Sequence, residues 1–278
     1  MKKILVPCDF SAQAMAALRF AIDLADDSGG VVYLLHVVEV PVMHSSVFMP
    51  TLGYGGEIVE DLIKNANKQF QRIQMKYGGQ GRKIKSDIVI GITTSAILEH
   101  VESVGADVVV MGTTGATGAK ELLVGSNAER IVRGSSIPVL TVKRYIRPSS
   151  IKNIVFPNTL LQDQEDLTLK VKGLQNLFKA KLHIVYINTP VNFLRDVVTL
   201  RRLKDFAKRF MLKDFTVNVY NDIYEEAGIN GFASSIPNSL IAIGTHGRTG
   251  IPHLLSGSVA EDVVNHVDRP VWTYAIKT

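Results

Sequence analysis

The chain has 278 residues, of which 46% are hydrophobic, and a formal net charge of +5; this length suits two domains of ordinary size, each with its own core. Its single cysteine, Cys8, excludes an internal disulfide framework. The small positive charge is not accompanied by a groove-reading motif, so the sequence does not indicate a nucleic-acid-binding protein.

Short apolar runs alternate with amphipathic segments along the first half. We expect strands at residues 3–7, 31–38, 83–90, 107–111 and 138–142. Between them we expect four helices: one that starts near Asp9 or Ser11, either of which can cap it, one around 58–73, one at 95–103 and one at 126–133. Strands therefore alternate with helices throughout this half.

The second half repeats this order. We expect strands at 153–156, 182–187, 216–220, 240–243 and 271–274, with helices around 167–174, 192–210 and 229–233 and a last helix from 258. Such alternation predicts two tandem α/β domains, residues 1–146 and 147–278, each an open doubly wound parallel sheet of Rossmann-like type. Residues 144–150 are basic and contain Pro148, so we interpret them as a linker.

The first residues carry no signal for export or membrane insertion. Residues 4–8 are apolar, but this run is far too short to span a bilayer and Pro7 interrupts it. A single cysteine is also compatible with a reducing compartment. We therefore expect a cytoplasmic protein that has no membrane partner.

One glycine pattern occurs in both halves. Gly112, Gly115, Gly125 and Ser126 recur 132 residues later as Gly244, Gly247, Gly257 and Ser258, in both cases as G-x2-G-x9-G-S. Nearer the start of each half the spacing is 150, as between Pro7 and Pro157, so the second copy lacks 18 residues in the region that matches 41–56. The chain is therefore a tandem duplication.

The repeated pattern has the chemistry of a phosphate site. Gly112 follows a buried strand, at the end where open parallel sheets bind ligands. Without side chains, Gly112, Gly115 and Gly118 let backbone N–H groups approach a polyphosphate, and a helix that starts at Gly125-Ser126 favours an anion at its first turn. The alternative is that the glycines only shape a turn and Ser126 only caps the helix. No P-loop lysine pattern occurs.

These segments resemble the universal stress protein family over essentially the whole chain. VVVMGTTG (108–115), LLVGSNAER (122–130), IGTHGR (243–248) and LLSGS (254–258) are similar to the C-terminal part of a family domain. KILVPCDFS (3–11) and LLHVV (34–38) are similar to its N-terminal part. The resemblance implies a nucleotide-binding α-hydrolase-like fold, and G-x2-G-x9-G-S is the family's ATP-binding signature.

The resemblance also implies which residues hold an adenine nucleotide, with or without Mg²⁺. In the first half they are Pro7, Cys8, Asp9, Val37, Met111, Gly112, Gly115, Gly118, Gly125, Ser126 and Asn127. In the second half they are Gly244, Gly247, Gly257 and Ser258. Thr159 stands where the first half has Asp9, whereas His246 and Arg248 stand where the first half has Thr114 and Ala116. We expect the first half to be the better site; the second half either binds through its glycine loop alone or is a structural partner.

Three kinds of function stay open. The leading hypothesis is a stress-response protein in which bound ATP, or a related nucleotide, switches a conformation or a partner interaction. The alternatives are a nucleotide-free scaffold and a slow ATPase. We assign no metal-ligating residues, since histidines such as His246, His253 and His266 are not at metal-site spacing. We also assign no catalytic residues, because the sequence shows no Ser-His-Asp or paired-carboxylate arrangement.

The ends of the two repeats suggest how the halves associate. Residues 139–142 and 271–274 are short final strands, and such strands are natural pairing elements. We expect them to lie between the halves in an intramolecular pseudo-dimer, and a further homodimer is compatible with the sequence. The basic run from Arg201 to Arg209 is interpreted as a solvated helix face, with a protein partner surface as the alternative.

Overall fold

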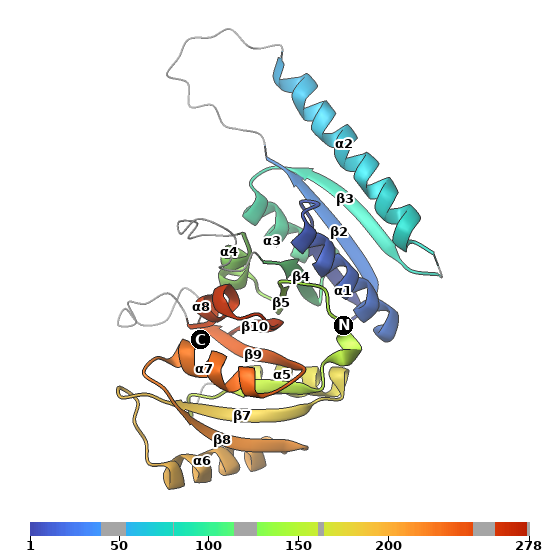
Figure 1. Ribbon diagram of the computed structural model, residues 1–278. Coiled ribbons are helices and arrows are strands. Elements are labelled where there is room, and N and C mark those ends of the chain that lie inside the picture. The colour runs from blue at the N-terminus through green and yellow to red at the C-terminus, as the bar shows by residue number, and fades with distance from the viewer. Residues whose placement is uncertain (40–53, 80, 114–126, 161–163, 247–258, 277–278) are drawn as a thin grey trace, which may run out of the picture.

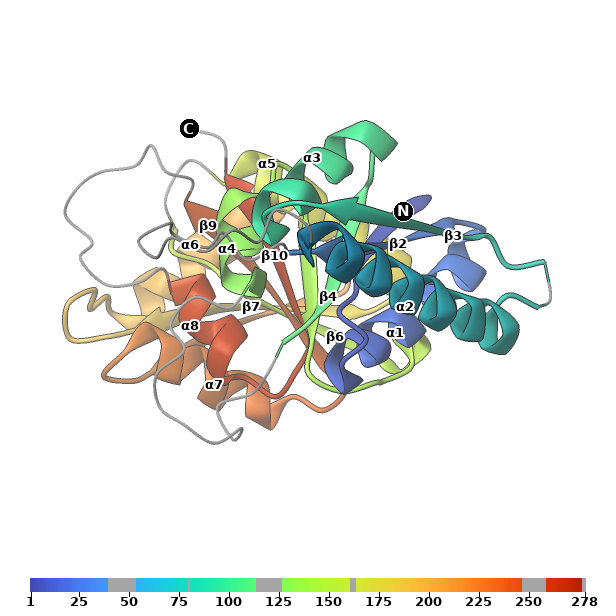
Figure 2. The ribbon, with the colours of Figure 1, turned by 90° about the horizontal axis from the view of Figure 1, so that it is seen from above.

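The computed structural model describes residues 1–39, 54–79, 81–113, 127–160, 164–246 and 259–276. They form one ten-stranded sheet with helices on both faces (Figures 1 and 2). The strand order is β3-β2-β1-β4-β5-β10-β9-β6-β7-β8, so the same order of five strands occurs in each half. The predicted tandem doubly wound α/β fold is confirmed.

The elements follow the predicted alternation. The first half comprises β1 (Lys3–Pro7), α1 (Ala12–Ser28), β2 (Val31–Val38), α2 (Tyr54–Tyr77), β3 (Ile84–Ile90), α3 (Thr93–Val104), β4 (Val108–Gly112), α4 (Asn127–Gly134) and β5 (Val139–Val142). After a 3-10 turn, Pro148–Ser150, the second half comprises β6 (Asn153–Pro157), α5 (Glu165–Phe178), β7 (Lys181–Asn188), α6 (Asp196–Arg209), β8 (Phe215–Asn221), α7 (Glu225–Ser235), β9 (Ser239–His246), α8 (Val259–His266) and β10 (Val271–Ile276).

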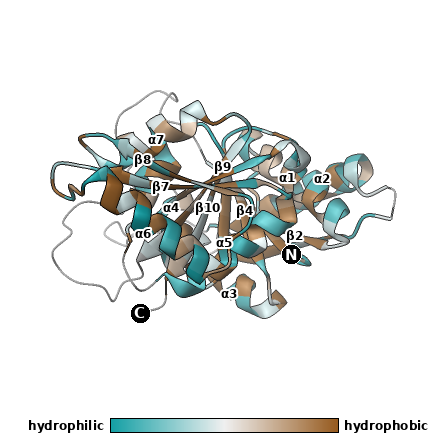
Figure 3. Cartoon of the chain, turned by 90° about the horizontal axis from the view of Figure 1, so that it is seen from below, coloured by the Kyte–Doolittle hydropathy of each residue, from teal (hydrophilic) through white to brown (hydrophobic). Residues whose placement is uncertain are grey.

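The strands are apolar on both faces because helices cover both faces. In β1, Ile4 and Val6 pack into one core cluster and Leu5 into the other, as the alternation of side chains along a strand requires. Helices α1, α2, α5 and α6 contribute to the first cluster, and α3, α4, α7 and α8 to the second. Figure 3 shows the apolar strands between these helices.

The two halves are joined by their last strands. β5 and β10 pair antiparallel, with Trp272 opposite Leu140, whereas every other strand pair is parallel. Thr141 Oγ1 donates to the carbonyl of Val271 at 3.3 Å, and Thr273 Oγ1 donates to that of Val139 at 3.2 Å. These two bonds are equivalent under the repeat, so the predicted placement of the final strands between the halves is confirmed.

The predicted start of one helix is wrong, and β9 and β10 extend two to three residues beyond their predicted ends. The helix expected over 192–210 begins only at Asp196. The preceding segment is held as a loop, because Tyr186 OH donates to the carbonyl of Asn192 at 2.6 Å and Leu194 N donates to Asn188 Oδ1 at 2.9 Å. Local hydrogen bonds to side chains at the end of β7, six residues earlier in the chain, thus outweigh the helical pattern of the sequence.

Candidate functional site

A cavity of about 230 Å³ opens at the carboxyl ends of the central strands of the first half. Its walls come from the ends of β1, β2 and β4 and from the starts of α1, α3 and α4. Seven of the predicted site residues line it, namely Pro7, Cys8, Asp9, Val37, Met111, Gly112 and Asn127. Residues far apart in the sequence therefore meet where doubly wound sheets bind ligands.

None of the other predicted site residues is seen to line this cavity. Gly115, Gly118, Gly125 and Ser126 lie outside the described residues, as do Gly247, Gly257 and Ser258 of the second half. Gly244 is described, but it lies in β9 and does not line the cavity. A larger cavity of about 430 Å³ lies elsewhere, between the end of α1 and the starts of β2 and β3, and contains none of the predicted residues.

The turn after β1 assigns separate roles to Asp9 and Ser11. Ser11 caps α1, because its Oγ accepts from Ala14 N at 3.2 Å. Asp9 is exposed at the cavity and its Oδ1 accepts from Ser11 N at 3.0 Å. The sequence offers both residues as caps; the structure shows that Ser11 is the cap, whereas Asp9 lines the cavity.

Phe10 fixes this turn in an unusual backbone conformation. Its φ is 65°, in the left-handed region that a phenylalanine rarely adopts. Its ring packs against His36, with centroids 4.6 Å apart, and against Phe70 at 5.6 Å. The repeat-equivalent Leu160 has a φ of 61°. The same backbone turn therefore follows the first strand of both halves, although its residues differ.

Cys8 is a wall residue and not a nucleophile. Burial raises the pKa of its thiol to about 11, so the reactive thiolate is scarce at neutral pH. Its backbone carbonyl accepts from Nδ1 of His36 at 2.8 Å, which ties the end of β1 to β2. Cys8 thus has the role of a buried wall thiol that its position after the first strand suggested.

Gly112 is required by packing. A Cβ at this position would collide with the backbone carbonyl of Gln13 and would lie 2.8 Å from Ala14 N. The end of β4 and the first turn of α1 therefore approach so closely that only glycine fits. At Gly244 an added Cβ would instead meet the side chains of Leu167 at 2.8 Å and Ile276 at 2.9 Å.

Several polar residues of the cavity were not predicted from the sequence as ligand contacts. They are Ser11, Gln13, His36, Thr93 and Thr113. Thr113 is buried, and its hydroxyl is among the described side-chain groups that have no hydrogen-bond partner. Thr93 N donates to Glu39 Oε1 at 3.1 Å, and hydrogen bonding to Thr93 lowers the pKa of Glu39. Four of them lie just beyond a strand end or at a helix start, whereas His36 lies within β2, two residues before its end.

The corresponding strand end of the second half is closed by its own hydrogen bonds. Buried Asn158 donates from Nδ2 to Gln164 Oε1 at 2.8 Å, and Gln164 Nε2 donates to Thr159 Oγ1 at 2.7 Å. Asn158 Oδ1 also accepts from Leu160 N at 2.8 Å. Neutral amides and a hydroxyl thus satisfy one another where the first half offers the carboxylate of Asp9.

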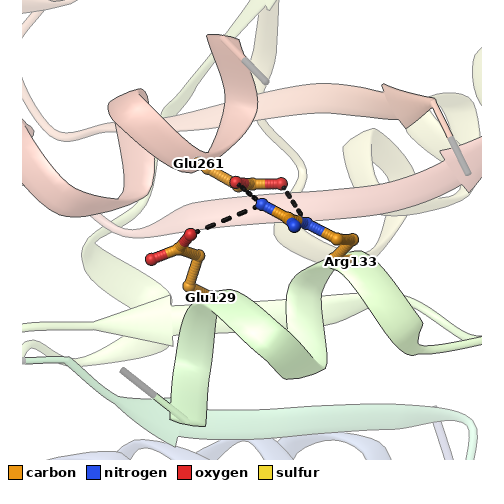
Figure 4. A network of polar contacts seen from close by, with 3 residues as sticks. All are labelled: Glu129, Arg133 and Glu261. Carbon is orange, nitrogen blue, oxygen red and sulfur yellow. Dashed lines mark hydrogen bonds and ion pairs between the residues drawn. The ribbon is translucent and has the colours of Figure 1, made fainter. Parts of the chain in front are cut away.

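An ion-pair network ties the helix that borders the cavity to the other half. Arg133 near the end of α4 donates from Nε to Glu261 Oε1 of α8 at 2.8 Å, and its Nη2 contacts Glu261 Oε2 (Figure 4). Nη2 also lies 3.5 Å from Glu129 Oε1. Glu261 is buried, so a two-point contact with arginine offsets the cost of its burial.

Neither a metal-binding group nor a membrane-spanning helix is found among the described residues. Their histidine, cysteine and acidic side chains form no group of three that could hold a metal ion. No helix in the described part of the chain is both long and apolar enough to cross a membrane.

A family match and two related sequences show which known proteins this chain is similar to. Residues 1–143 and 222–274 match the universal stress protein family. Universal stress protein MJ0531 of Methanocaldococcus jannaschii is 34% identical over 144 residues, covering 51% of this chain and 82% of its own. A universal stress protein E homolog of Haemophilus influenzae is 25% identical and covers 95% of this chain and 94% of its own.

A solved structure agrees over the full length. A universal stress protein from Archaeoglobus fulgidus superposes with a TM-score of 0.77 at 17% identity, covering 99% of this chain and 98% of that one. At this identity the likeness supports the fold. Together with the family match over more than half of the chain, it leads to one conclusion: the chain belongs to the universal stress protein family.

Proposed function

We propose that the first half binds an adenine nucleotide of the ATP class in the cavity at the ends of β1, β2 and β4. The observation that carries the proposal is the convergence of seven residues, predicted from the sequence as ligand contacts, on one cavity. Family membership supports the same assignment, because the G-x2-G-x9-G-S signature continues directly from Gly112 in this chain.

The chemistry of the walls suits the two ends of a nucleotide. Asp9 offers a carboxylate that accepts hydrogen bonds from ribose hydroxyls or the adenine amino group, and Val37 offers an apolar contact for the base. Asn127 starts α4 at the cavity, so the positive end of that helix faces the space that phosphates would occupy. We propose Gly115, Gly118, Gly125 and Ser126 as further phosphate contacts.

A magnesium ion would depend on the nucleotide for its ligands. The described residues supply no group of three carboxylate, histidine or cysteine side chains. Mg²⁺ commonly keeps several waters and binds through substrate phosphates, so the ion would accompany the triphosphate instead of occupying a protein cage. We therefore propose ATP binding with Mg²⁺ as an optional companion.

We propose that the second half is mainly a structural partner. Asn158, Thr159 and Gln164 hydrogen-bond to one another at the end of β6, the strand that corresponds to β1 of the first half. Few polar groups at this strand end are therefore available to a ligand. A nucleotide entering there would have to break those bonds, at a cost of about 1 kcal/mol or more for each group left without a partner. Occupancy of one nucleotide per chain is the consequence.

The proposed role is binding without rapid turnover, in which nucleotide occupancy in the stress response switches a conformation or a partner interaction. A nucleotide-free scaffold is the second candidate. It is favoured by Gly112, because the close approach of α1 to β4 is enough to explain why glycine is needed at this position. A glycine that packing requires is not by itself a sign of ligand contact.

Nucleotide released from the native protein decides between the two candidates. The protein is purified without added nucleotide, denatured, and the released small molecules are identified by mass. Calorimetric titration of ligand-free protein with ATP, and with GTP as the matched control, then gives affinity and stoichiometry. An adenine nucleotide at one per chain supports binding. Absence of a released nucleotide together with no heat on titration with ATP establishes the scaffold.

A further inference from the structure

The outward face of α6 is strongly basic. Over its length the helix carries five cations and two carboxylates, all exposed: Asp196, Arg201, Arg202, Lys204, Asp205, Lys208 and Arg209. Its other face is apolar and buried, with Leu203 and Ala207 packed into the core. Figure 1 shows α6 at the outer end of the molecule, next to β8.

Large apolar side chains are exposed beside these cations. Val191, Phe193, Val197, Ile223 and Tyr224 are 67 to 90% exposed, and we call them the edge patch. They come from the loop before α6, the first turn of α6 and the segment before α7. Exposed apolar side chains that gather in one place are uncommon on soluble proteins and mark contact surfaces.

The edge patch is built on ordered backbone. Asn192 Nδ2 donates to Glu225 Oε1 at 2.8 Å, which fastens the loop before α6 to the start of α7. The carbonyl of Asn192 accepts from Tyr186 OH at 2.6 Å. Two neighbouring segments are thus held together by polar contacts that leave their apolar side chains in solvent.

One member of the edge patch, Val197, shares a face of α6 with the cations. Val197, Arg201, Lys204 and Lys208 follow each other at intervals of four, three and four residues, so they share one stripe of the helix. The stripe starts in the edge patch and ends in cations.

We propose that the edge patch and the basic face of α6 bind the surface of an anionic lipid membrane. Side chains such as Phe193 and Val191 would enter the interface while the cations contact lipid phosphates and carboxylates. This differs from the expectation that no membrane partner exists, which rested on the absence of a spanning segment. A peripheral contact needs no such segment.

Other occupants fit this surface less well. A second copy of the chain would place basic α6 helices against each other, because a two-fold interface brings the same surface to both sides. Nucleic acid would bind the cations through its phosphates, but this mode of binding does not explain why Val191, Val197 and Ile223 are exposed. A protein partner would bury such highly exposed side chains in pockets of its own, whereas a lipid interface deforms around them.

Vesicle binding tests the proposal with the full-length protein. Cosedimentation is measured with phosphatidylcholine vesicles and with vesicles that contain about 30 mol% phosphatidylserine, at low and at raised salt. We expect binding to the anionic vesicles alone, weakened by salt. Absence of binding to phosphatidylserine vesicles at low salt overturns the proposal.

Paired variants separate the surface from net charge. The double variant Arg201→Glu/Lys204→Glu should lower affinity for anionic vesicles about tenfold or more. The control Lys64→Glu/Lys68→Glu makes the same change of net charge on exposed positions of α2, the equivalent helix of the first half, and should leave binding nearly unchanged. Equal losses in the two double variants would mean that overall charge, and not this surface, attracts the protein.

A third variant tests the apolar contribution. Phe193→Ser keeps every charge and removes a side chain that is 68% exposed and so contributes little to the core. We expect several-fold weaker binding to anionic vesicles, with circular dichroism unchanged. Binding equal to that of the unaltered protein would reject insertion of the edge patch and with it the proposed membrane contact.

Discussion

Arg133 of α4 holds the buried carboxylate of Glu261 on α8 with two of its nitrogen atoms, and the two residues belong to different halves. The repeat-equivalent of Arg133 is Asn265, so only one of the two symmetry-related bridges exists. In its place Lys143 Nζ donates to the carbonyl of Asn265 at 2.7 Å. The contact between the halves is therefore asymmetric in its chemistry although symmetric in its backbone.

The Arg133 bridge should contribute to stability. Arg133→Ala leaves the Glu261 carboxylate without its main cation, and we expect a loss of about 1–2 kcal/mol, discounted because the arginine is half exposed. Denaturant unfolding measures the effect. Arg130→Ala, at an exposed position of the same helix, is the matched control and should cost much less. Equal effects would show that the bridge adds nothing beyond helix content.

Gly112 and Gly244 should respond unequally to the same substitution. Gly112→Ala forces a Cβ against the backbone of α1, which cannot yield, and should cost about 2–3 kcal/mol. Gly244→Ala meets side chains that can adjust, and should cost about 1 kcal/mol. Thermal unfolding of both variants checks this order. A reversed order would contradict the packing role assigned to Gly112.

Asp9 and Thr159 test the proposed difference between the halves. If Asp9 accepts a hydrogen bond from bound nucleotide, Asp9→Ala should weaken ATP binding about tenfold to a hundredfold, whereas Thr159→Ala should change it little. Calorimetric titration gives both affinities. Circular dichroism must confirm the fold, since Asp9 also supports the turn that starts α1. Loss of binding in Thr159→Ala alone would move the nucleotide site to the second half.

The thiol of Cys8 should resist alkylation in the native protein. Its pKa is raised to about 11, so at pH 8 the thiolate fraction is far below that of an ordinary cysteine. We expect iodoacetamide to react about a hundredfold more slowly than with the unfolded chain, and faster as the pH rises toward 11. Mass measurement follows the reaction at this single cysteine. Equal rates in the native and unfolded states would mean that the thiol is not buried.

The pairing of β5 with β10 predicts one compact particle in solution. For 278 residues a compact chain has a radius of gyration of about 19 Å, and projecting segments such as α2 raise it slightly. Small-angle scattering measures this value. A distance distribution with two separate maxima would show that the halves do not share the sheet.

Much of this structure was predictable because the repeat makes each half a check on the other. Apolar runs gave the strands, and the first glycine of the pattern marked the end of β4, whereas β9 runs past Gly244 to His246. The loop before α6 was not predictable, since it depends on a hydrogen bond that Tyr186 OH donates and on another that Asn188 Oδ1 accepts, and β7 brings both residues there. The domain boundary near residue 146 stays a prediction.

Within the candidate site, the sequence located residues that follow a strand and missed those that depend on packing. His36 reaches the cavity because it bonds to the carbonyl of Cys8, and Thr93 because α3 starts beside Glu39. The closure of the second half depends on Gln164, whose side chain spans Asn158 and Thr159. No spacing rule in one sequence encodes such three-residue contacts.

Because the fused sheet places β5 and β10 at its centre, its free edges are β3 and β8. Exposed edges are templates for pairing with other chains, and both of these carry polar side chains that discourage it. Lys85, Ser86 and Asp87 are exposed on β3, while Asn218 on β8 donates its amide to the carbonyl of Ile184 in the neighbouring strand. Duplication has thus buried β5 and β10, the apolar last strands of the two repeats, against each other, which protects the chain against edge-to-edge aggregation.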